Sequence, residues 1–485
     1  MMALEHFDVL IVGAGISGIG AACHLQKNCP GKTYLIVEAR AAPGGTWDLF
    51  RYPGIRSDSD MYTLGYAFKP WTHPRAIADA PQILDYLKET VAEHQLEPHM
   101  RYGHKVVSAK WSTARARWEV EIEQQATGDS ILLSCDFLHM CSGYYNYDHG
   151  YTPEFEGTEC FNGPIIHPQH WPEGLDYQGK RMVVIGSGAT AVTLVPALAK
   201  TAAHVTMLQR SPTYVVSRPA EDRFANKLRE FLPGKLAYFI IRWRNILFQR
   251  VIYERCRKYP RQAQARIIAM VRDELGPQYD VDTHFTPTYY PWDQRLCLVP
   301  DGDMFKAIRE GRASVVTDHI DCFTGNGLRL KSGKELQADI IVTATGLELQ
   351  FLSDVVITVD GEVLEPGRAL SYKGMMVSGV PNMALSAGYT NASWTLKCDL
   401  TCDYVCRLLN YMDRHGYRIC TPVNRDPNLE VEAYMSLSSG YIQRALDKFP
   451  RQGARAPWKL YQNYIRDIFA LRFGRLADGV MEFSR

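Results

Sequence analysis

Two buried strands of this chain run directly into glycine-rich turns, and this feature constrains the fold most. Residues 7–12 form an almost continuous apolar run, which is typical of a strand buried on both faces of a parallel sheet. A Gly-x-Gly-x-x-Gly turn at residues 13–18 follows, then a helical segment at 19–26 and a second apolar strand at 33–37. This order of elements predicts a strand–helix–strand unit of an α/β fold.

The three glycines of this turn have separate roles when such a unit binds a dinucleotide. Gly13 permits the tight turn, Gly15 lets a pyrophosphate approach the backbone, and Gly18 lets the helix pack closely against the strand. The free N–H groups at the helix start then meet the phosphates. Glu38 stands 20 residues after Gly18, where a carboxylate accepts hydrogen bonds from an adenosine ribose. A glycine turn without a ligand is the alternative, and the acidic residue argues against it.

A second unit of the same kind begins at Arg181. Its strands are expected at residues 182–185 and 204–208, with a helix from the turn to about residue 200. The turn between them has the accepted variant pattern Gly-x-Gly-x-x-Ala. The residues at its three defined positions are Gly186, Gly188 and Ala191.

The end of the second strand distinguishes the two units. Arg210 and Ser211 stand where Glu38 stands in the first unit. A guanidinium beside a hydroxyl favours the 2′-phosphate of NADPH, whereas a carboxylate repels it. A solvated surface arginine is the alternative. We therefore expect FAD in the first unit and NADPH in the second.

Composition excludes several other classes of protein. A chain of 485 residues exceeds what one core usually covers, so two or more domains are expected. The net charge of +1 argues against nucleic acid as a partner. None of the twelve cysteines stands in a C-x-x-C pair, which argues against the simplest zinc and dithiol sites, and we expect no metal site. The N-terminus lacks the pattern of a secretory signal, which predicts a cytoplasmic protein with reduced cysteines.

Two segments of unusual composition add to this picture. Residues 43–60 are rich in glycine and aromatic side chains and follow the first unit directly, so we expect Gly45, Thr46, Trp47 and Asp58 to contact the flavin. An idle surface loop is the alternative. Residues 236–259 combine aromatic and basic side chains. Such a helix can lie on a membrane surface, but we favour one that covers a domain edge.

The segment between the two units carries the pattern F-x-G-x-x-x-H-x-x-x-W-P. This pattern resembles the fingerprint of the Baeyer–Villiger monooxygenases, which are class B flavin monooxygenases. Residues 44–65 further resemble the subgroup that includes the ethionamide-activating monooxygenase. The resemblance covers nearly the whole chain and is weakest at residues 220–285 and after about residue 420. The fingerprint positions are occupied by Phe161, Gly163, His167, Trp171 and Pro172.

The resemblance implies an α/β fold with two Rossmann-like domains, one for FAD and one for NADP. Strands at residues 136–143 and 338–346, which end in small-residue turns, indicate where the chain crosses between them. The FAD domain is then discontinuous. The expected parts are an FAD domain at 1–145 and 346–485, a linker at 146–178, and an NADP domain at 179–345 with a helical insertion at about 217–290.

The resemblance also implies the reaction and the residues that carry it out. Dioxygen would be activated as a C4a-peroxyflavin that converts ketones to esters or lactones and also oxidises sulfides. The family's active-site arginine matches Arg295, and the aspartate that holds it matches Asp58. A guanidinium suits this role because its charge does not depend on pH, although a structural salt bridge is the alternative. His167 matches a linker histidine that governs domain movement, with a general base as the competing interpretation.

Three other functions remain open from the sequence. An S- or N-oxidising flavin monooxygenase shares the fold, and one enzyme can catalyse both kinds of reaction. The second is a pyridine-nucleotide disulfide reductase, which would need a redox-active cysteine pair near the flavin. The third is a nucleotide-sensing protein that catalyses no reaction. Cys398, Cys402 and Cys406 recur every four residues on a predicted helix, which suits buried small side chains better than an incomplete metal site.

Overall fold

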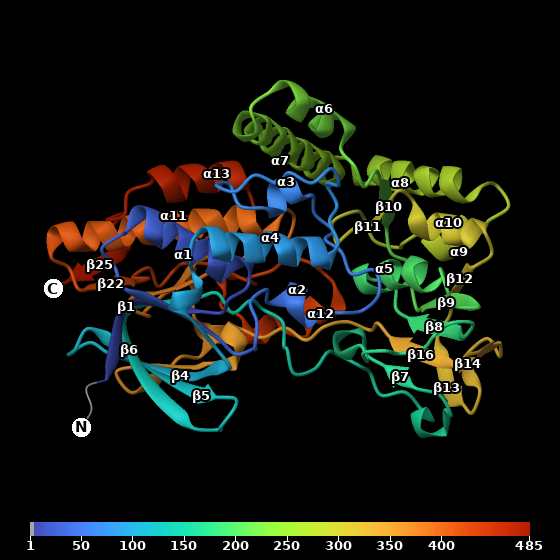
Figure 1. Cartoon of the computed structure of the whole chain (residues 1–485), viewed down its shortest axis with the longest axis horizontal. Coiled ribbons are helices and arrows are strands. Elements are labelled where there is room, and N and C mark those ends of the chain that lie inside the picture. Colours follow the sequence, from blue (N-terminus) through green and yellow to red (C-terminus); the bar gives the residue numbers. More distant parts are fainter. Residues whose placement is uncertain (1–3) are drawn as a thin grey trace.

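The computed structural model describes residues 4–485 and contains two large sheets, a mixed one of nine strands and a parallel one of five (Figure 1). The larger sheet has nine strands in the order β18-β17-β4-β5-β6-β1-β2-β3, with β21 also paired to β6. Its strands are β1 (Glu5–Val12), β2 (Tyr34–Glu38), β3 (Met100–Tyr102), β4 (His104–Ser112), β5 (Arg117–Gln124), β6 (Ser130–Met140), β17 (Val356–Val359), β18 (Glu362–Val363) and β21 (Met383–Leu385). Both ends of the sequence therefore contribute to one sheet.

In the larger sheet, the direction of neighbouring strands correlates with how deeply they are buried. Strands β21, β6, β1, β2 and β3 pair in parallel, and the last four residues of β1 are fully buried. Strands β4, β5 and β6 are antiparallel, and β5 alternates buried with partly exposed side chains. This difference is expected, because a parallel layer is covered on both faces while an antiparallel hairpin has one wet face.

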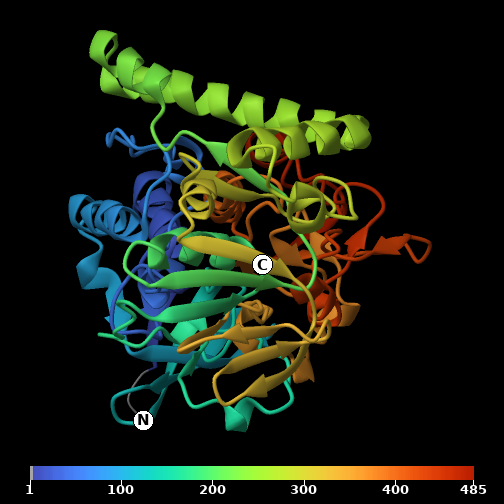
Figure 2. The ribbon, with the colours of Figure 1, turned by 90° about the vertical axis from the view of Figure 1, so that its right-hand side faces the viewer.

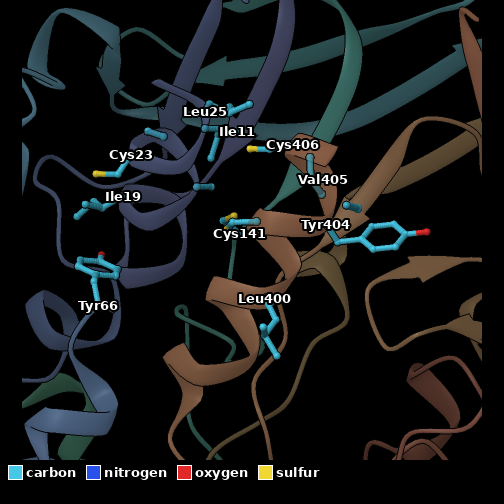
Figure 3. Close-up of a cluster of buried hydrophobic side chains, with 14 of the residues drawn as sticks. Ile11, Ile19, Cys23, Leu25, Tyr66, Cys141, Leu400, Tyr404, Val405 and Cys406 are labelled. Carbon is cyan, nitrogen blue, oxygen red and sulfur yellow. The ribbon is translucent and has the colours of Figure 1, made fainter. Parts of the chain in front are cut away.

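Helices α1 (Ile16–Asn28) and α11 (Trp394–His415) pack side by side against the larger sheet. Figure 3 shows Ile19, Cys23 and Leu25 of α1 in the same core as Val405 and Cys406 of α11. The three cysteines of α11 are all buried, and burial raises the pKa of the Cys398 thiol. No cluster of three or more potential metal ligands occurs within residues 4–485.

The smaller sheet has five strands in the order β12-β9-β8-β16-β7, and every neighbouring pair is parallel. These strands are β7 (Ile165–Ile166), β8 (Arg181–Ile185), β9 (His204–Gln209), β12 (Ala313–Thr317) and β16 (Ile340–Thr343). Helices α5 (Ala189–Leu198) and α10 (Asp303–Arg309) lie in the same domain and contact each other. Strand β7 belongs to the segment expected to be a linker, and it pairs along the edge of β16.

A helical segment separates two strands that pair with each other, β10 (Val215–Arg218) and β11 (Cys297–Pro300). Its helices are α6 (Arg223–Phe231), α7 (Gly234–Lys258), α8 (Pro260–Leu275) and α9 (Val281–Phe285). Figure 2 shows the long helices of this segment lying along the outer edge of the molecule. No helix in residues 4–485 is both long and apolar enough to cross a membrane. The α/β class expected from the sequence is confirmed.

Candidate functional site

The first glycine turn joins β1 to α1 with little space for side chains. The Gly13 N–H donates to the Val37 carbonyl at 2.7 Å, and Gly13 has a φ of +105°. A Cβ placed on Gly13 would lie 2.7 Å from the Cys141 carbonyl oxygen, and one on Gly18 would lie 1.8 Å from the Gly13 carbonyl oxygen. Glycine is thus required at both positions by close backbone contact. Gly15 precedes α1, whose first turn has no side-chain cap, so its N–H groups are free for an anion.

Glu38 lies at the end of β2 and is almost fully buried. Its carboxylate accepts hydrogen bonds from the backbone N–H of Ala14 at 2.7 Å and of Arg40 at 2.9 Å. Burial raises its pKa, and the two N–H donors oppose this shift. The carboxylate is therefore held in one orientation beside the glycine turn, where its remaining lone pairs can accept a ribose hydroxyl.

The loop that follows β2 folds back over the first turn. Gly45 has a φ of +56°, and a Cβ on Gly45 would lie 3.1 Å from the Gly15 Cα, so the two backbones are in close approach. Thr46 starts the short helix α2 (Thr46–Leu49), and its hydroxyl lies 3.4 Å from that of Tyr147. Trp47 packs against the core next to the turn. The loop encloses the first turn.

The second glycine turn joins β8 to α5 with the same backbone geometry. The Gly186 N–H donates to the Leu208 carbonyl at 2.8 Å, and a Cβ on Gly186 would lie 2.3 Å from the Ala344 carbonyl oxygen. A Cβ on Gly188 would meet nothing within 4 Å. Ala191 is completely buried in the core of this domain. This turn is therefore open to solvent at the position where a pyrophosphate would approach.

Arg210 and Ser211 follow β9 and are both exposed. The Ser187 hydroxyl donates to the Ser211 carbonyl oxygen at 3.2 Å, which holds the two strand ends of this unit together. The pair stands at the edge of the second turn, as the sequence predicts. Neither residue lines the large cavity described next.

One cavity of about 760 Å³ runs from the first turn towards the second domain, and this volume suits a large organic ligand. The cavity is lined by seven of the residues that are expected to contact the flavin, namely Gly13, Gly15, Glu38, Gly45, Thr46, Trp47 and Asp58. Gly18 lies beneath the turn rather than in the cavity. The second unit contributes Ala189 and Thr190, but its predicted glycines lie outside. A glycine-lined cradle with a buried carboxylate and uncapped helix N–H groups fits a dinucleotide such as FAD.

Arg295 and Asp58 meet at the inner end of this cavity. Arg295 Nη2 lies 3.4 Å from Asp58 Oδ2, and roughly a third of each side chain is exposed. The Asp58 charge raises the pKa of Arg295, so the guanidinium stays protonated. Arg295 lines the cavity, and its contact with Asp58 is the one ion pair that its guanidinium makes among the described residues. Trp292, in the loop before it, has a φ of +71°, a strained conformation of the kind found at functional sites.

Helix α7 holds both loops that carry this ion pair. Asn245 Nδ2 donates to Asp60 Oδ1 at 2.9 Å, just after Asp58 in sequence. Near the other end of the helix, Arg257 Nη1 donates to Asp293 Oδ1 at 2.7 Å. The position of the helical insertion is therefore coupled to the position of the Arg295–Asp58 pair.

A smaller pocket adjoins the large cavity, and Arg295 and Tyr144 line both. The rings of Tyr144 and Trp394 stack at 4.9 Å, and burial raises the pKa of Tyr441 to about 12, so its phenol stays neutral. The other walls are mostly apolar and include Leu385, Met435, Leu437 and Phe449. An apolar pocket with one permanent cation suits a small organic substrate that develops negative charge on one atom.

His167 directly follows β7 of the smaller sheet and does not line the cavity. The Gln169 N–H donates to His167 Nδ1 at 3.2 Å, so that nitrogen is the acceptor and Nε2 donates to the Gly346 carbonyl at 3.1 Å. Burial lowers the pKa of His167, and its ring packs against Gly150. Phe161 and Ile166 are buried beside the smaller sheet. These contacts tie the linker to the turn that follows β16.

Comparison with known proteins identifies the family. Residues 66–272 match the flavin-binding monooxygenase-like family, and residues 11–87 match an NAD(P)-binding Rossmann-like domain. The chain is 56% identical over 482 residues to the FAD-containing monooxygenase EthA of Mycobacterium tuberculosis, covering 99% of this chain and 98% of that one. The chain belongs to the class B flavin monooxygenases. The family resemblance noted in the sequence is thereby confirmed.

Three further monooxygenases match most of the chain. The probable FAD-binding monooxygenase AlmA of Acinetobacter baylyi is 52% identical over 483 residues, covering 99% of this chain and 97% of that one. A solved steroid monooxygenase bound to NADP superposes with a TM-score of 0.73 at 25% identity, over 86% of this chain and 88% of that one. Cyclohexanone monooxygenase of Rhodococcus sp. Phi1, bound to NADP⁺, shares the fold with a TM-score of 0.72 at 22% identity, over 87% of each chain.

Sequence reasoning missed several residues of the cavity walls in this flavin monooxygenase. Tyr144 and Thr190 line the large cavity, and Tyr441 lines the adjoining pocket. Tyr144 directly follows the Cys-Ser-Gly turn after β6, and Thr190 lies within the second glycine turn, so their place beside known motifs was a usable signal. Tyr441 has no such signal, because it lies in a segment without a motif.

Proposed function

We propose that this chain uses FAD and NADPH to insert one oxygen atom of dioxygen into ketones, yielding esters or lactones, and that it also oxidises sulfides. The observation that carries this proposal is the Arg295–Asp58 pair at the junction of the large cavity and the apolar pocket. Membership of the class B flavin monooxygenases supports the cofactors and the kind of reaction.

The larger sheet would form the FAD domain, discontinuous in sequence, and the smaller sheet the NADP domain with α6–α9 as its insertion. Gly13, Gly15 and Glu38 would hold the adenosine and pyrophosphate of FAD, with the loop at Gly45–Trp47 over it. Gly186, Gly188, Ala191, Arg210 and Ser211 would form the NADPH site. FAD bound by these residues would supply the redox chemistry, with NADPH as the reductant and dioxygen as the oxidant.

Because all twelve cysteines are free thiols, we propose a cytoplasmic location.

The residues of the chain contribute charge, orientation and exclusion of water. As a nucleophile adds to a ketone, negative charge develops on the carbonyl oxygen, and the Arg295 N–H groups can stabilise it. Asp58 lies beside the guanidinium and orients it, and the negative charge of its carboxylate raises the pKa of Arg295 further above the usual value. The stacked rings of Tyr144 and Trp394 line the same two cavities as Arg295, and their apolar faces would strengthen the interaction by lowering the local polarity.

Arg295→Ala tests the proposal, with Arg295→Lys as the matched variant that keeps a positive charge. NADPH consumption, ester formation from aryl and linear ketones, and sulfoxide formation from a thioether are measured together. We expect Arg295→Ala to retain its flavin and to lose about a hundredfold or more in ester formation, the scale for removing one charge-stabilising donor. Arg295→Lys should retain part of the wild-type rate of ester formation.

Two outcomes would contradict the proposal. If the wild-type protein forms sulfoxide and never ester, the reaction is heteroatom oxidation rather than Baeyer–Villiger oxidation. If Arg295→Ala forms ester at the wild-type rate, then Arg295 has no role in catalysis. Flavin content, measured from visible absorbance, distinguishes either result from loss of the cofactor.

A further inference from the structure

Helix α7 has an apolar stripe on the side that faces solvent. Leu236, Phe239, Ile240, Leu247 and Val251 are all exposed, and Phe239 is 58% exposed. Leu236 and Ile240 are four residues apart, Ile240 and Leu247 seven, and Leu247 and Val251 four, so these positions share one face of the helix, with Phe239 at its margin. On ordinary protein surfaces exposed apolar side chains are scattered singly, whereas here they form a continuous row on one helix.

The opposite face of α7 is already used by the protein. Ala237, Tyr238 and Ile241 are buried, and buried Arg242 donates to the carbonyl oxygens of Tyr62 and Gly65, each at 2.7 Å. The exposed stripe therefore cannot turn inward without breaking these contacts, and its exposure is a fixed property of the fold.

Neighbouring elements extend the apolar stripe into a broader surface. Phe224 and Phe231 are exposed on α6, seven residues apart and so on one side of that helix, and Phe231 is 72% exposed. Trp243 of α7 contacts Tyr464 with ring centroids 6.2 Å apart. Tyr464 begins α13 (Tyr464–Ile468; Figure 1), which continues into a π-helix at Phe469–Phe473. Phe469 and Phe473 are both exposed. We term these exposed side chains of α6, α7 and residues 469–473 the apolar ridge.

Positive charge is concentrated in the helices of this ridge. Residues 223–275, which span α6 to α8, contain thirteen Lys and Arg and four Asp and Glu, a net charge of +9. The whole chain has a net charge of +1, so the remainder is acidic. Lys227, Lys235, Arg255 and Lys258 are exposed on α6 and α7. Charge and apolar surface therefore coincide on one side of the molecule.

We propose that the apolar ridge docks on the surface of an anionic lipid bilayer. Exposed Phe and Leu side chains would enter the boundary between headgroups and acyl chains, and the surrounding Lys and Arg would pair with anionic headgroups. A second copy of this chain fits less well, because a symmetric contact would bring two strongly positive surfaces together. Nucleic acid needs no row of exposed aliphatic side chains, and the ridge has one.

Co-sedimentation with vesicles of phosphatidylglycerol and phosphatidylcholine tests the docking. The wild-type protein should bind these vesicles at low salt, bind much less to pure phosphatidylcholine, and be released as salt rises. The double variant Phe239→Ser/Leu247→Ser should bind at least about tenfold more weakly, since two apolar side chains are lost. Val356→Ser/Val363→Ser is the matched control, because both valines are exposed on the β17–β18 hairpin. It should bind like the wild type.

Three outcomes would overturn the proposal. The first is that the wild-type protein does not bind anionic vesicles at low salt. The second is that Phe239→Ser/Leu247→Ser binds them as tightly as the wild type. In the third, light scattering would show that the ridge mediates dimerisation, with the double variant monomeric and no vesicle binding by either. Thermal unfolding of each variant checks that it is folded, and these surface positions are not in the cofactor or substrate sites.

Discussion

The two glycine turns share one backbone design and differ in their surroundings. In each, the first glycine donates its N–H to the neighbouring strand, at 2.7 Å for Gly13 and 2.8 Å for Gly186. In each, an added Cβ would clash with a carbonyl oxygen just after a paired strand, that of Cys141 after β6 or of Ala344 after β16. The local geometry is therefore common to both nucleotide sites.

What lies around each turn separates the two sites. The first is covered by the loop at Gly45 and backed by a buried carboxylate at Glu38, whereas Gly188 faces open space and Arg210 is exposed. An enclosed site suits a cofactor that stays bound through many turnovers, and an open one suits a nucleotide that exchanges. The same motif can therefore serve a resident or a diffusible ligand, depending on the tertiary structure that covers it.

Substitutions at the third defined position of each turn, Gly18 or Ala191, should show the largest difference in stability and flavin content. A Cβ on Gly18 would lie 1.8 Å from the Gly13 carbonyl oxygen, so Gly18→Ala must displace the backbone of the first turn. We expect a loss of more than about 3 kcal/mol of unfolding free energy and of bound flavin. The reciprocal change Ala191→Gly should cost only about 1 kcal/mol, the helix propensity of glycine. Flavin absorbance and thermal unfolding measure both, and a stable, flavin-loaded Gly18→Ala protein would contradict this view.

The helices that follow the two turns should differ in their response to pH. Although burial lowers the pKa of His24 on α1, contacts with Asp399 and Asp403 of α11 raise it to about 9. Because this folded pKa exceeds the unfolded value near 6.5, the stabilisation is complete below pH 6.5 and is lost as pH rises through 9. It amounts to at most about 3 kcal/mol. Helix α5 contains no ionisable residue.

Chemical unfolding followed across this pH range measures the His24 contribution. The His24→Gln variant should show a flatter decline in stability between pH 6.5 and 9 than the wild-type protein. Equal slopes for the two proteins would mean that His24 is not held protonated by α11.

The smallest expected effect concerns nucleotide choice at the second turn. Arg210→Gln should reduce the preference for NADPH over NADH about tenfold, because one charged contact to a 2′-phosphate is lost. Flavin content should not change, since Arg210 lies outside the large cavity. Lys200→Gln, at another exposed position of the same domain, is the control. An unaltered NADPH preference in Arg210→Gln would place the 2′-phosphate elsewhere.

Much of the fold could be predicted because the nucleotide units are local. The first strand was expected at 7–12 and occupies Glu5–Val12, and the second unit's strands were expected at 182–185 and 204–208 and occupy Arg181–Ile185 and His204–Gln209. Apolar runs and glycine positions act over a few residues, so sequence alone carries them. The pairing of Asp58 with Arg295 came from family resemblance, since no local pattern links residues so far apart.

The sequence by itself determined the two strand–turn–helix units, the glycines they require and the residue types at their ribose ends, because these depend on backbone sterics within each unit. Only the tertiary structure decided which turn is covered, which side chains meet in the cavity, and that the outer face of α7 is apolar. Helical spacing predicts that apolar residues share a face, but what covers that face depends on contacts between distant segments.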